Sequence, residues 1–442
     1  MSLTRDASGK LLLGGVLLED VVLRHGTPTY VYDLDGMAEK ARDLVAAFEG
    51  TAHLVAYAVK ANAAGAVIRT LAKEGCGADV VSGAELRVAT ACGVPPERIV
   101  FSGVAKSDEE IDYALLTGPM GIRAVQLESV EEVARVAARA KFVSRRARVA
   151  IRVNPSVDPT EAPHPHIATG HDEAKFGVPL EDLGRALELV EKSPHLELVG
   201  MGVHAGSQFK HVAPYLRAAK ILLDEVKKLR KAGTAKSLQY VDTGGGFGVD
   251  YGEGAAVPPS EFVRAVRAEM KARKLDDLAL YVEPGRVLVA SSGVLLAKVI
   301  QSKVATADRW LMIDAGMNDL VRPALYQARH RIVPLEREAT QGEAFGWHVV
   351  GPVCESSDDF GEHLLPKLPP TQIAILDAGA YGYTMASRYN GRQLPVEVFI
   401  QNGKIHAVTE RATVESWAAE RARAGEPTRL RATVPMAKAE KR

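Results

Sequence analysis

Short β-rich runs alternate with longer helical runs from about residue 50 to residue 290, and this alternation constrains the fold more than any other feature. Such a pattern predicts parallel strands joined by crossover helices. Eight strands favour a closed (β/α)8 barrel of the TIM type, although an open doubly wound sheet has a similar pattern. The predicted strands are 53–60, 78–82, 98–103, 124–128, 147–154, 197–205, 237–243 and 278–284.

Helical runs occupy the gaps between these strands. Two of them begin with a capping box, in which a serine is followed three residues later by a glutamate: Ser107 with Glu110, and Ser129 with Glu132. The other predicted helices are 65–75, 83–92, 180–192, 212–232 and 260–274.

Polar residues at the predicted strand ends decide between the two kinds of sheet. Lys60, Ser102 and His204 stand at or just past the C-terminal ends of their strands, which is where barrel active sites gather. A barrel phosphate site typically uses the loops after strands seven and eight, and here those loops contain 244–248 and 283–286. This agreement favours the barrel.

After residue 290 the pattern changes to short apolar runs separated by turns, which predicts an all-β domain of β-barrel or β-sandwich type. Strand-like runs near the N-terminus are expected to join it. We therefore predict a barrel unit at 33–289, a β domain made of 1–32 and 290–417, and a frayed tail at 418–442.

Composition excludes several classes of function. Lys and Arg number 55, as do Asp and Glu, so net charge gives no argument for nucleic acid or a membrane surface. The sequence has no apolar stretch long enough to span a bilayer, and its start lacks the apolar core of a signal peptide. Cysteines and histidines lack the spacing of a disulfide framework or a metal site. We expect a cytoplasmic protein without a metal.

Lys60 ends an apolar run, and an ammonium at the end of a buried strand is unfavourable unless the protein uses it. A desolvated lysine loses its proton readily and becomes a nucleophilic amine, which a Schiff base with an aldehyde cofactor requires. The alternative is a lysine that merely extends to solvent.

Residues at the last two strand ends suit a phosphorylated cofactor. Three consecutive glycines at 244–246 let backbone N–H groups surround an anion without interference from a Cβ, although a tight turn is the alternative. Glu283 can hold a proton on the nitrogen of a pyridoxal ring, which favours decarboxylation over racemisation. A salt bridge between Glu283 and Arg286 is the alternative.

Three further residues are candidates. His204 can stack on the cofactor ring, with a satisfied core histidine as the alternative, and Ser207 can donate to the phosphate. Cys354 stands in a glycine- and proline-containing segment beside an acidic residue, so an acid–base role is the functional interpretation. The alternative for Cys354 is a small buried hydrophobe.

From Tyr57 to Val398 the chain resembles the fold-type III pyridoxal phosphate-dependent decarboxylases, and within them the branch that acts on diaminopimelate. The resemblance is carried, in order, by segments 57–62, 152–155, 166–177, 204–208, 244–246, 283–286, 314–326, 354–355 and 379–381.

The resemblance implies a role for each candidate residue. Lys60 would bind pyridoxal 5′-phosphate as a Schiff base, His204 would stack on the ring, and Glu283 would pair with its nitrogen. The expected phosphate-binding residues are Ser207, Gly245, Gly246, Gly285, Arg286 and Tyr381. The expected substrate contacts are Arg286, Arg322, Tyr326, Glu355 and Tyr381. Cys354 would protonate the carbanion after carbon dioxide leaves, and Cys354 and Glu355 would come from the partner subunit of a homodimer.

Arg322 is the residue expected to select the substrate. Diaminopimelate carries a second carboxylate at its far end, and an arginine can bind such a group through two hydrogen bonds, with Tyr326 close by. The alternative for Arg322 is an ordinary salt bridge. Alternative activities are decarboxylation of lysine, ornithine or a carboxylated polyamine such as carboxynorspermidine, and a non-catalytic regulator on the same fold. The long connection at 156–177 is a lid candidate on length alone.

Overall fold

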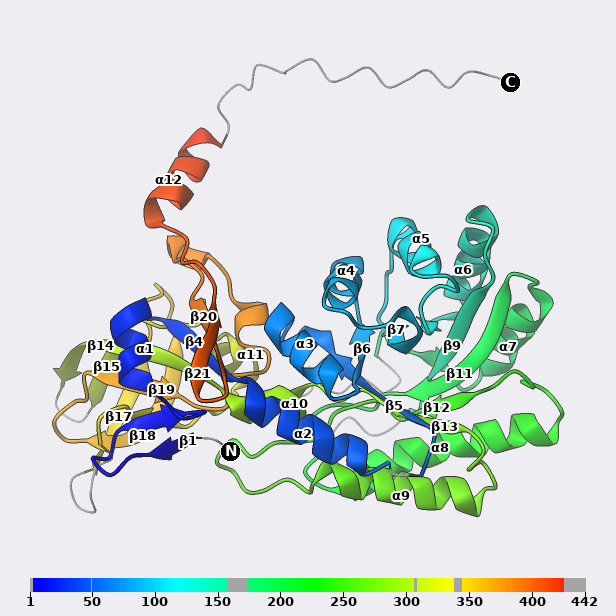
Figure 1. Cartoon of the computed structure of the whole chain (residues 1–442), viewed down its shortest axis with the longest axis horizontal. Helices are drawn as coiled ribbons and strands as arrows, with labels where there is room; N and C mark the ends of the chain where they lie inside the picture. The colour runs from blue at the N-terminus through cyan, green and yellow to red at the C-terminus, as the bar shows by residue number, and fades with distance from the viewer. Residues whose placement is uncertain (1–2, 49, 157–173, 306–307, 338–343, 425–442) are drawn as a thin grey trace.

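The computed structural model describes residues 3–48, 50–156, 174–305, 308–337 and 344–424. Figure 1 shows two units side by side, a barrel surrounded by helices and a domain built on a mixed sheet. The expected lid at 156–177 lies almost wholly outside the described residues.

The barrel is closed. All pairings between neighbouring strands are parallel, and β9 pairs with β8 as well as with β11, which completes the ring. This closure confirms the barrel and excludes the open sheet. The strands are β5 (His53–Ala58), β6 (Gly77–Val80), β7 (Ile99–Phe101), β8 (Ala124–Leu127), β9 (Ala147–Asn154), β11 (Leu196–Val203), β12 (Tyr240–Asp242) and β13 (Ala279–Val282). A short strand, β10 (Val178–Pro179), adds to β9.

An apolar plug fills the N-terminal end of the barrel interior. Inward-facing side chains of β5, β7, β8, β9, β11, β12 and β13 form one buried cluster, in which the rings of Tyr240 and Tyr281 stack with centroids 3.9 Å apart. Polar residues such as Asp242, the last residue of β12, begin one layer further along. The interior is therefore dry at one end and polar at the end where the site lies.

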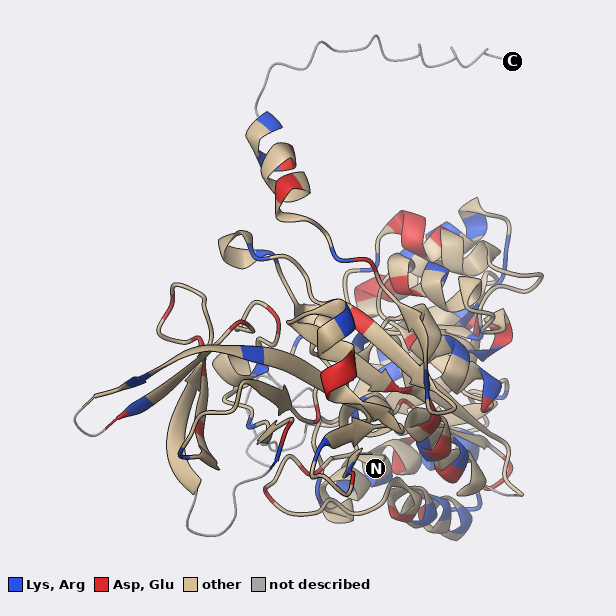
Figure 2. Cartoon of the chain, turned by 60° about the vertical axis from the view of Figure 1, so that its left-hand side comes forward, with Lys and Arg blue, Asp and Glu red and all other residues tan. Residues whose placement is uncertain are grey.

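Helices cover the outside of the barrel (Figure 1). They are α2 (Leu34–Ala46), α3 (Gly65–Lys73), α4 (Gly83–Ala91), α5 (Asp108–Leu116), α6 (Val130–Phe142), α7 (Leu183–Lys192), α8 (Val212–Lys231), α9 (Pro259–Ala272) and the short α10 (Arg286–Val289). In Figure 2 the ribbon positions of Lys and Arg and those of Asp and Glu are interspersed along these helices, in keeping with the balanced charge.

One predicted capping box is confirmed and the other is half wrong. Ser107 and Glu110 cap each other's backbone at the start of α5. Ser129 accepts from the backbone of Glu132, but the Glu132 carboxylate accepts from the backbone N–H of Glu128 and from buried Lys106 instead. A buried ammonium binds a carboxylate more strongly than a backbone N–H does, so Lys106 draws Glu132 out of the box.

The second unit is built on a nine-stranded mixed sheet. Its main path runs β18-β17-β15-β14-β4-β20-β21, so the N-terminal strand β4 lies between β14 and β20. The strands are β4 (Thr29–Asp33), β14 (Gly293–Val304), β15 (Arg309–Ile313), β16 (Ile332–Pro334), β17 (Ala344–Val350), β18 (Asp359–Pro366), β19 (Gln372–Ile375), β20 (Val396–Gln401) and β21 (Lys404–Val408).

Smaller elements complete the unit. A three-stranded sheet of β1 (Leu3–Arg5), β2 (Leu11–Leu13) and β3 (Val16–Leu17) precedes helix α1 (Leu18–His25). Helix α12 (Val414–Arg423) begins at Thr413, whose side chain accepts from the backbone of Ser416, and so enters the segment expected to be frayed. Among the helices of the described ranges, none has the length and apolar character to cross a membrane.

Candidate active site

Lys60 lies in the short 3-10 turn η1 (Val59–Ala61) that follows β5. Its Nζ atom forms an ion pair with Asp79 Oδ2 at 2.7 Å, and 36% of its side-chain surface is exposed. Burial lowers the pKa of Lys60, but the carboxylates of Asp79 and Glu283 raise it more, so the net shift is upward. The prediction that desolvation frees this amine of its proton is therefore wrong for the protein alone, because Asp79 stabilises the ammonium.

Three buried carboxyl groups, those of Asp79, Asp242 and Glu283, cluster next to Lys60. We call these three residues the acidic floor. They come from the ends of β6, β12 and β13. Burial, followed by Asp242 and Asp79, raises the pKa of Glu283 well above its ordinary value. Burial also raises the pKa of Asp242, to about 7. A cation placed against this floor would reverse these shifts.

Asp79 was not among the residues predicted from the sequence. Its position in the buried strand β6, close to the polar end of the barrel, was the available signal. Asp79 Oδ1 is buried and accepts no hydrogen bond from the residues that the structure describes. The floor therefore has unused capacity for a donor.

His204 follows β11, as predicted, and its backbone carbonyl accepts from Arg152 Nη2 at 3.4 Å. Arg152 in turn donates to Glu128 Oε1 at 3.2 Å. Burial first, and then the positive charges of Arg152 and Lys60, lower the pKa of His204 well below its ordinary value. The imidazole is therefore neutral, so it can stack on a cationic ring without charge repulsion.

The glycine loop after β12 forms a cradle free of side chains. A Cβ at Gly245 would lie 2.0 Å from the Glu283 carbonyl oxygen, so no larger residue fits there. Gly246 has a φ of 89°, a left-handed conformation that glycine adopts without strain. Its carbonyl accepts from the backbone N–H of Phe209 at 2.8 Å, which places the loop beside the segment containing Ser207.

Arg286, the first residue of α10, reaches Ser207 rather than Glu283. Its guanidinium donates to Ser207 Oγ at 3.1 Å and to the Tyr251 hydroxyl at 3.0 Å, and it lies 4.8 Å from the centre of the Tyr381 ring. The alternative of a Glu283–Arg286 salt bridge is therefore wrong. The pairing with Ser207 brings two predicted phosphate ligands together.

Arg322 begins α11 (Arg322–Tyr326), which also carries Tyr326. Its Nη1 donates to His330 Nε2 at 2.7 Å, and its guanidinium lies 4.8 Å from the centre of the Tyr251 ring. His330 Nδ1 bonds the Leu376 carbonyl, so Nδ1 carries the hydrogen and Nε2 accepts. Burial, and then Arg322, lower the pKa of His330 to about 3, which keeps this acceptor neutral.

Arg286 and Arg322 are both buried, and in the described part of the chain neither forms an ion pair with a carboxylate. We call this pair the basic rim. Arg286 Nε is also buried without a hydrogen-bond partner among the described residues. Buried cations are unfavourable unless paired, so the rim is suited to an anion from outside the chain.

Tyr381 reaches the barrel from the β domain. Its backbone N–H donates to the Ala61 carbonyl at 2.8 Å, directly after Lys60, and its hydroxyl lies close to Gly285. Tyr381 has a φ of 57°, a left-handed conformation that is uncommon outside glycine. The β domain thus contributes Tyr381, Arg322 and Tyr326 to the end of the barrel that carries Lys60.

Cys354 and Glu355 lie elsewhere on the chain. They stand in the exposed loop between β17 and β18, and Cys354 is a free, exposed thiol rather than a buried hydrophobe. In the described residues the side-chain hydrogen bonds of this pair join Asn390, Tyr389 and Ser357, and the backbone of Glu355 bonds that of Val353 and Asp358. None of these contacts joins Cys354 or Glu355 to the acidic floor or the basic rim.

Comparisons with known proteins now bear on this geometry. The sequence profile of the pyridoxal-dependent decarboxylases, for their pyridoxal binding domain, matches residues 34–290. A curated diaminopimelate decarboxylase from Zymomonas mobilis is 41% identical over 418 residues, covering 92% of this chain and 96% of the relative. The chain belongs to the diaminopimelate decarboxylase family. It is a pyridoxal phosphate-dependent decarboxylase.

Solved structures of the family agree with the fold. Diaminopimelate decarboxylase from Helicobacter pylori, complexed with L-lysine, matches with a TM-score of 0.84 at 36% identity, covering 92% of this chain and all (100%) of that one. The enzyme from Methanocaldococcus jannaschii, also with L-lysine, matches with a TM-score of 0.87 at 34% identity, covering 95% and 97%.

The site of this family member fits pyridoxal phosphate at both ends. The acidic floor suits the ring nitrogen, because a protonated nitrogen would satisfy carboxyl oxygens that lack donors, such as Asp79 Oδ1. The basic rim and the Gly245 cradle suit the phosphate, which needs donors close to the backbone. Lys60 lies beside the floor.

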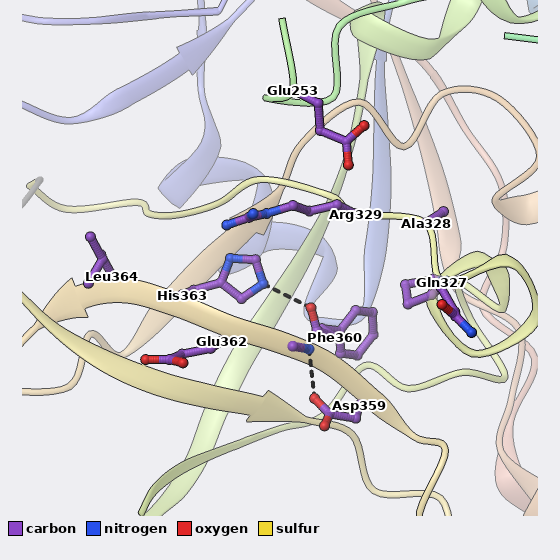
Figure 3. A pocket seen from close by; sticks show the side chains of 11 residues that line it. Glu253, Gln327, Ala328, Arg329, Asp359, Phe360, Glu362, His363 and Leu364 are labelled. Atoms are coloured by element: carbon purple, nitrogen blue, oxygen red, sulfur yellow. Dashed lines mark hydrogen bonds between the residues drawn. The ribbon is translucent and has the colours of Figure 1, made fainter. Parts of the chain in front are cut away.

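A separate polar cavity of about 690 Å³ lies beside α11, between β18 and the loop that contains Glu253. Figure 3 shows the Arg329 side chain extending toward the imidazole of His363, with Glu253 nearby. His363 Nε2 donates to the Phe360 carbonyl at 2.9 Å. The residues that line this cavity include no member of the acidic floor or the basic rim, so it lies outside the cofactor site.

Proposed function

We propose that this protein decarboxylates meso-2,6-diaminopimelate to L-lysine and carbon dioxide, the last step of bacterial lysine synthesis. One observation carries the substrate assignment: Arg322 is buried beside the site without a carboxylate partner in the described residues, so it is available to an anionic group of the substrate. Family relatives that carry this name, and two solved with L-lysine, support the same reaction.

Pyridoxal phosphate, when bound, supplies an electron sink for the carbanion left by the departing carbon dioxide. Lys60 would provide the amine that binds it, and Glu283 would hold the proton on its ring nitrogen. His204 would pack against the ring as a neutral imidazole. The phosphate would be held by Ser207, Gly245, Gly246, Gly285, Arg286 and Tyr381.

In this proposal Arg322 and Tyr326 hold the distal carboxylate of the substrate. Arg286 and Tyr381 contact the part of the substrate that lies nearer the cofactor ring. The planar guanidinium of Arg322 offers two parallel donors, which a lysine side chain cannot match. Because His330 already accepts from one Nη atom, it fixes the orientation of this fork. Substrates that end in a bare ammonium would leave Arg322 unpaired.

The thiol of Cys354 would donate a proton to the α-carbon in place of the departed carbon dioxide, and Glu355 would bind the distal ammonium, both from the second subunit of a homodimer. The exposure of the loop that carries Cys354 and Glu355 supports this assignment, as do its hydrogen bonds, which in the described residues join it to the loop with Tyr389 and Asn390 and not to the acidic floor or the basic rim. We also propose that the enzyme acts in the cytoplasm, and that the chain divides into a barrel unit at 33–289 and a β domain of 1–32 and 290–417.

The decisive experiment measures carbon dioxide and L-lysine formation from meso-diaminopimelate with added pyridoxal phosphate, beside L-lysine, L-ornithine and carboxynorspermidine as substrates. We expect turnover on diaminopimelate alone. Turnover only on substrates with a bare ammonium would refute the role of Arg322 while keeping the cofactor site. A protein that binds the cofactor but turns over none of the four would favour a regulator.

A further inference from the structure

A loop of the β domain, Arg388–Arg392, holds the segment that carries Cys354 and Glu355, and we call it the clamp loop. The Tyr389 hydroxyl donates to the Glu355 carboxylate. Asn390 Oδ1 accepts from the backbone N–H of Cys354 at 2.8 Å. Two residues further on, Arg392 donates to the carbonyl of Pro352 at 3.3 Å. Each contact meets a different residue of the Cys354 segment, so the clamp restrains the position and the rotation of that segment.

The backbone of the clamp loop is set for this contact. Asn390 has a φ of 53° and a ψ of 23°, a left-handed conformation that asparagine tolerates better than most residues. Gly391 follows with a φ of 72°. The residue that reaches Cys354 therefore holds an unfavourable conformation, which persists only where neighbouring contacts support it.

Helix α12 supplies that support. Trp417 is the one residue of α12 that is not exposed, and the helix is fully described. Its indole packs against the backbone of Gly391, so closely that a Cβ added to Gly391 would lie 2.8 Å from the indole ring. Arg388 and Glu420 form a weaker ion pair at 3.7 Å. Figure 1 shows α12 standing off the body of the domain.

We propose that the clamp loop and Trp417 of α12 are positioning elements. They fix Cys354 for proton donation to the substrate and Glu355 for substrate binding. The catalytic part of this inference rests on the proposed function. The positional part rests on the contacts alone. Trp417 and Asn390 touch neither cofactor nor substrate in this scheme and act through the segment that they hold.

The test compares hydrogen exchange of peptides spanning 351–358 in the full-length holoenzyme and its variants. Asn390→Gly removes the acceptor but keeps a left-handed backbone, so the fold is retained. Trp417→Ala removes the support from α12, and Glu415→Ala, on the exposed side of the same helix, is the control. We expect exchange to rise about fivefold in Asn390→Gly, the effect of losing one hydrogen bond, to rise also in Trp417→Ala because the clamp loop loses its packing support, and to stay unchanged in the control. Asn390→Asp, which keeps an acceptor, should restore protection.

Kinetics test the catalytic part. We expect kcat on diaminopimelate to fall about fivefold or more in Trp417→Ala and Asn390→Gly, with unchanged visible absorption of the bound cofactor and recovery in Trp417→Phe. Equal exchange in variants and wild type, or an equal rise in barrel peptides, would overturn the clamp. Faster exchange at 351–358 with unaltered kcat would overturn its catalytic role. A wild-type enzyme inactive on diaminopimelate, with the exchange pattern intact, would refute the proposed function and leave the clamp standing.

Discussion

At the scale of single residues, the site keeps opposite charges at its two ends. Three carboxyl groups stand below Lys60, and two guanidinium groups stand on the side of the phosphate cradle. Each end lacks enough internal partners in the described chain, as Asp79 Oδ1 and Arg286 Nε show. A ligand with a cationic ring and anionic groups satisfies both ends at once.

Arg322→Met tests the assignment of the distal carboxylate. Methionine fills a similar volume without charge, so we expect the fold to persist and kcat/KM on diaminopimelate to fall about a hundredfold, on the order of 3 kcal/mol, as a buried charge pair is lost. Steady-state kinetics with circular dichroism as the folding control make the measurement. Arg322→Lys should recover only part of the rate, because it restores the charge without the fork. Full activity in the methionine variant would remove Arg322 from substrate binding.

At the scale of elements, the central sheet of the β domain contains a buried acid. Glu397 lies in β20, which pairs with β4, and burial raises its pKa to about 7. The folded protein therefore binds this proton more tightly than the unfolded chain. Its contribution to stability is present below the unfolded pKa and is lost as pH rises through about 7.

Glu397→Gln should remove this dependence. We expect the variant to match wild type near pH 5 and to be more stable at pH 8, by on the order of 1–3 kcal/mol, because glutamine carries no charge into the sheet. Thermal unfolding of both proteins at the two pH values measures the difference, and other buried acids cancel in the comparison. An identical pH dependence in the two proteins would show that Glu397 titrates normally.

Local patterns predicted the elements of the barrel well, because helical and strand periodicity depend on neighbours in sequence. The predicted helix at 83–92 and observed α4 (Gly83–Ala91) differ by one residue. Contacts distant in sequence were not predictable in this way. The charge state of Lys60 depends on Asp79, and the second capping box fails because Lys106 reaches Glu132. Periodicity also missed α1, α2, β18 and β21, so the omissions include a 13-residue helix that packs on the barrel.

Candidate residues from recognised motifs came together on one end of the barrel, except for Cys354 and Glu355. Lys60, Glu283 and Arg286 each follow a strand end, so the barrel geometry alone converges them. The position of Cys354 depends on loop contacts such as that with Asn390, which is far away in sequence and has no local signal. In the proposed function, Cys354 meets Lys60 only when two chains assemble.

At the scale of the whole molecule, that relation gives a mixing experiment. Lys60→Ala should abolish turnover, and Cys354→Ala should slow it strongly. When the two variants are mixed and allowed to exchange subunits, each hybrid dimer regains one intact site, and we expect about a quarter of wild-type activity. Recovery is measured as carbon dioxide release after mixing, with each variant alone as control. Absence of recovery, despite confirmed hybrid dimers, would place both residues in one chain.

The position of β4 has a consequence for biosynthesis. Strand β4 hydrogen-bonds to β14 on one side and to β20 on the other. Both partners follow the barrel in the sequence, so they leave the ribosome only after the whole barrel has been made. An unpaired strand of buried residues must therefore wait through most of translation, with both edges open to wrong partners. We expect the barrel to form first and the emergence of β20 to complete the native sheet, so a chain that stops before residue 396 should be captured by chaperones instead of accumulating as a folded fragment.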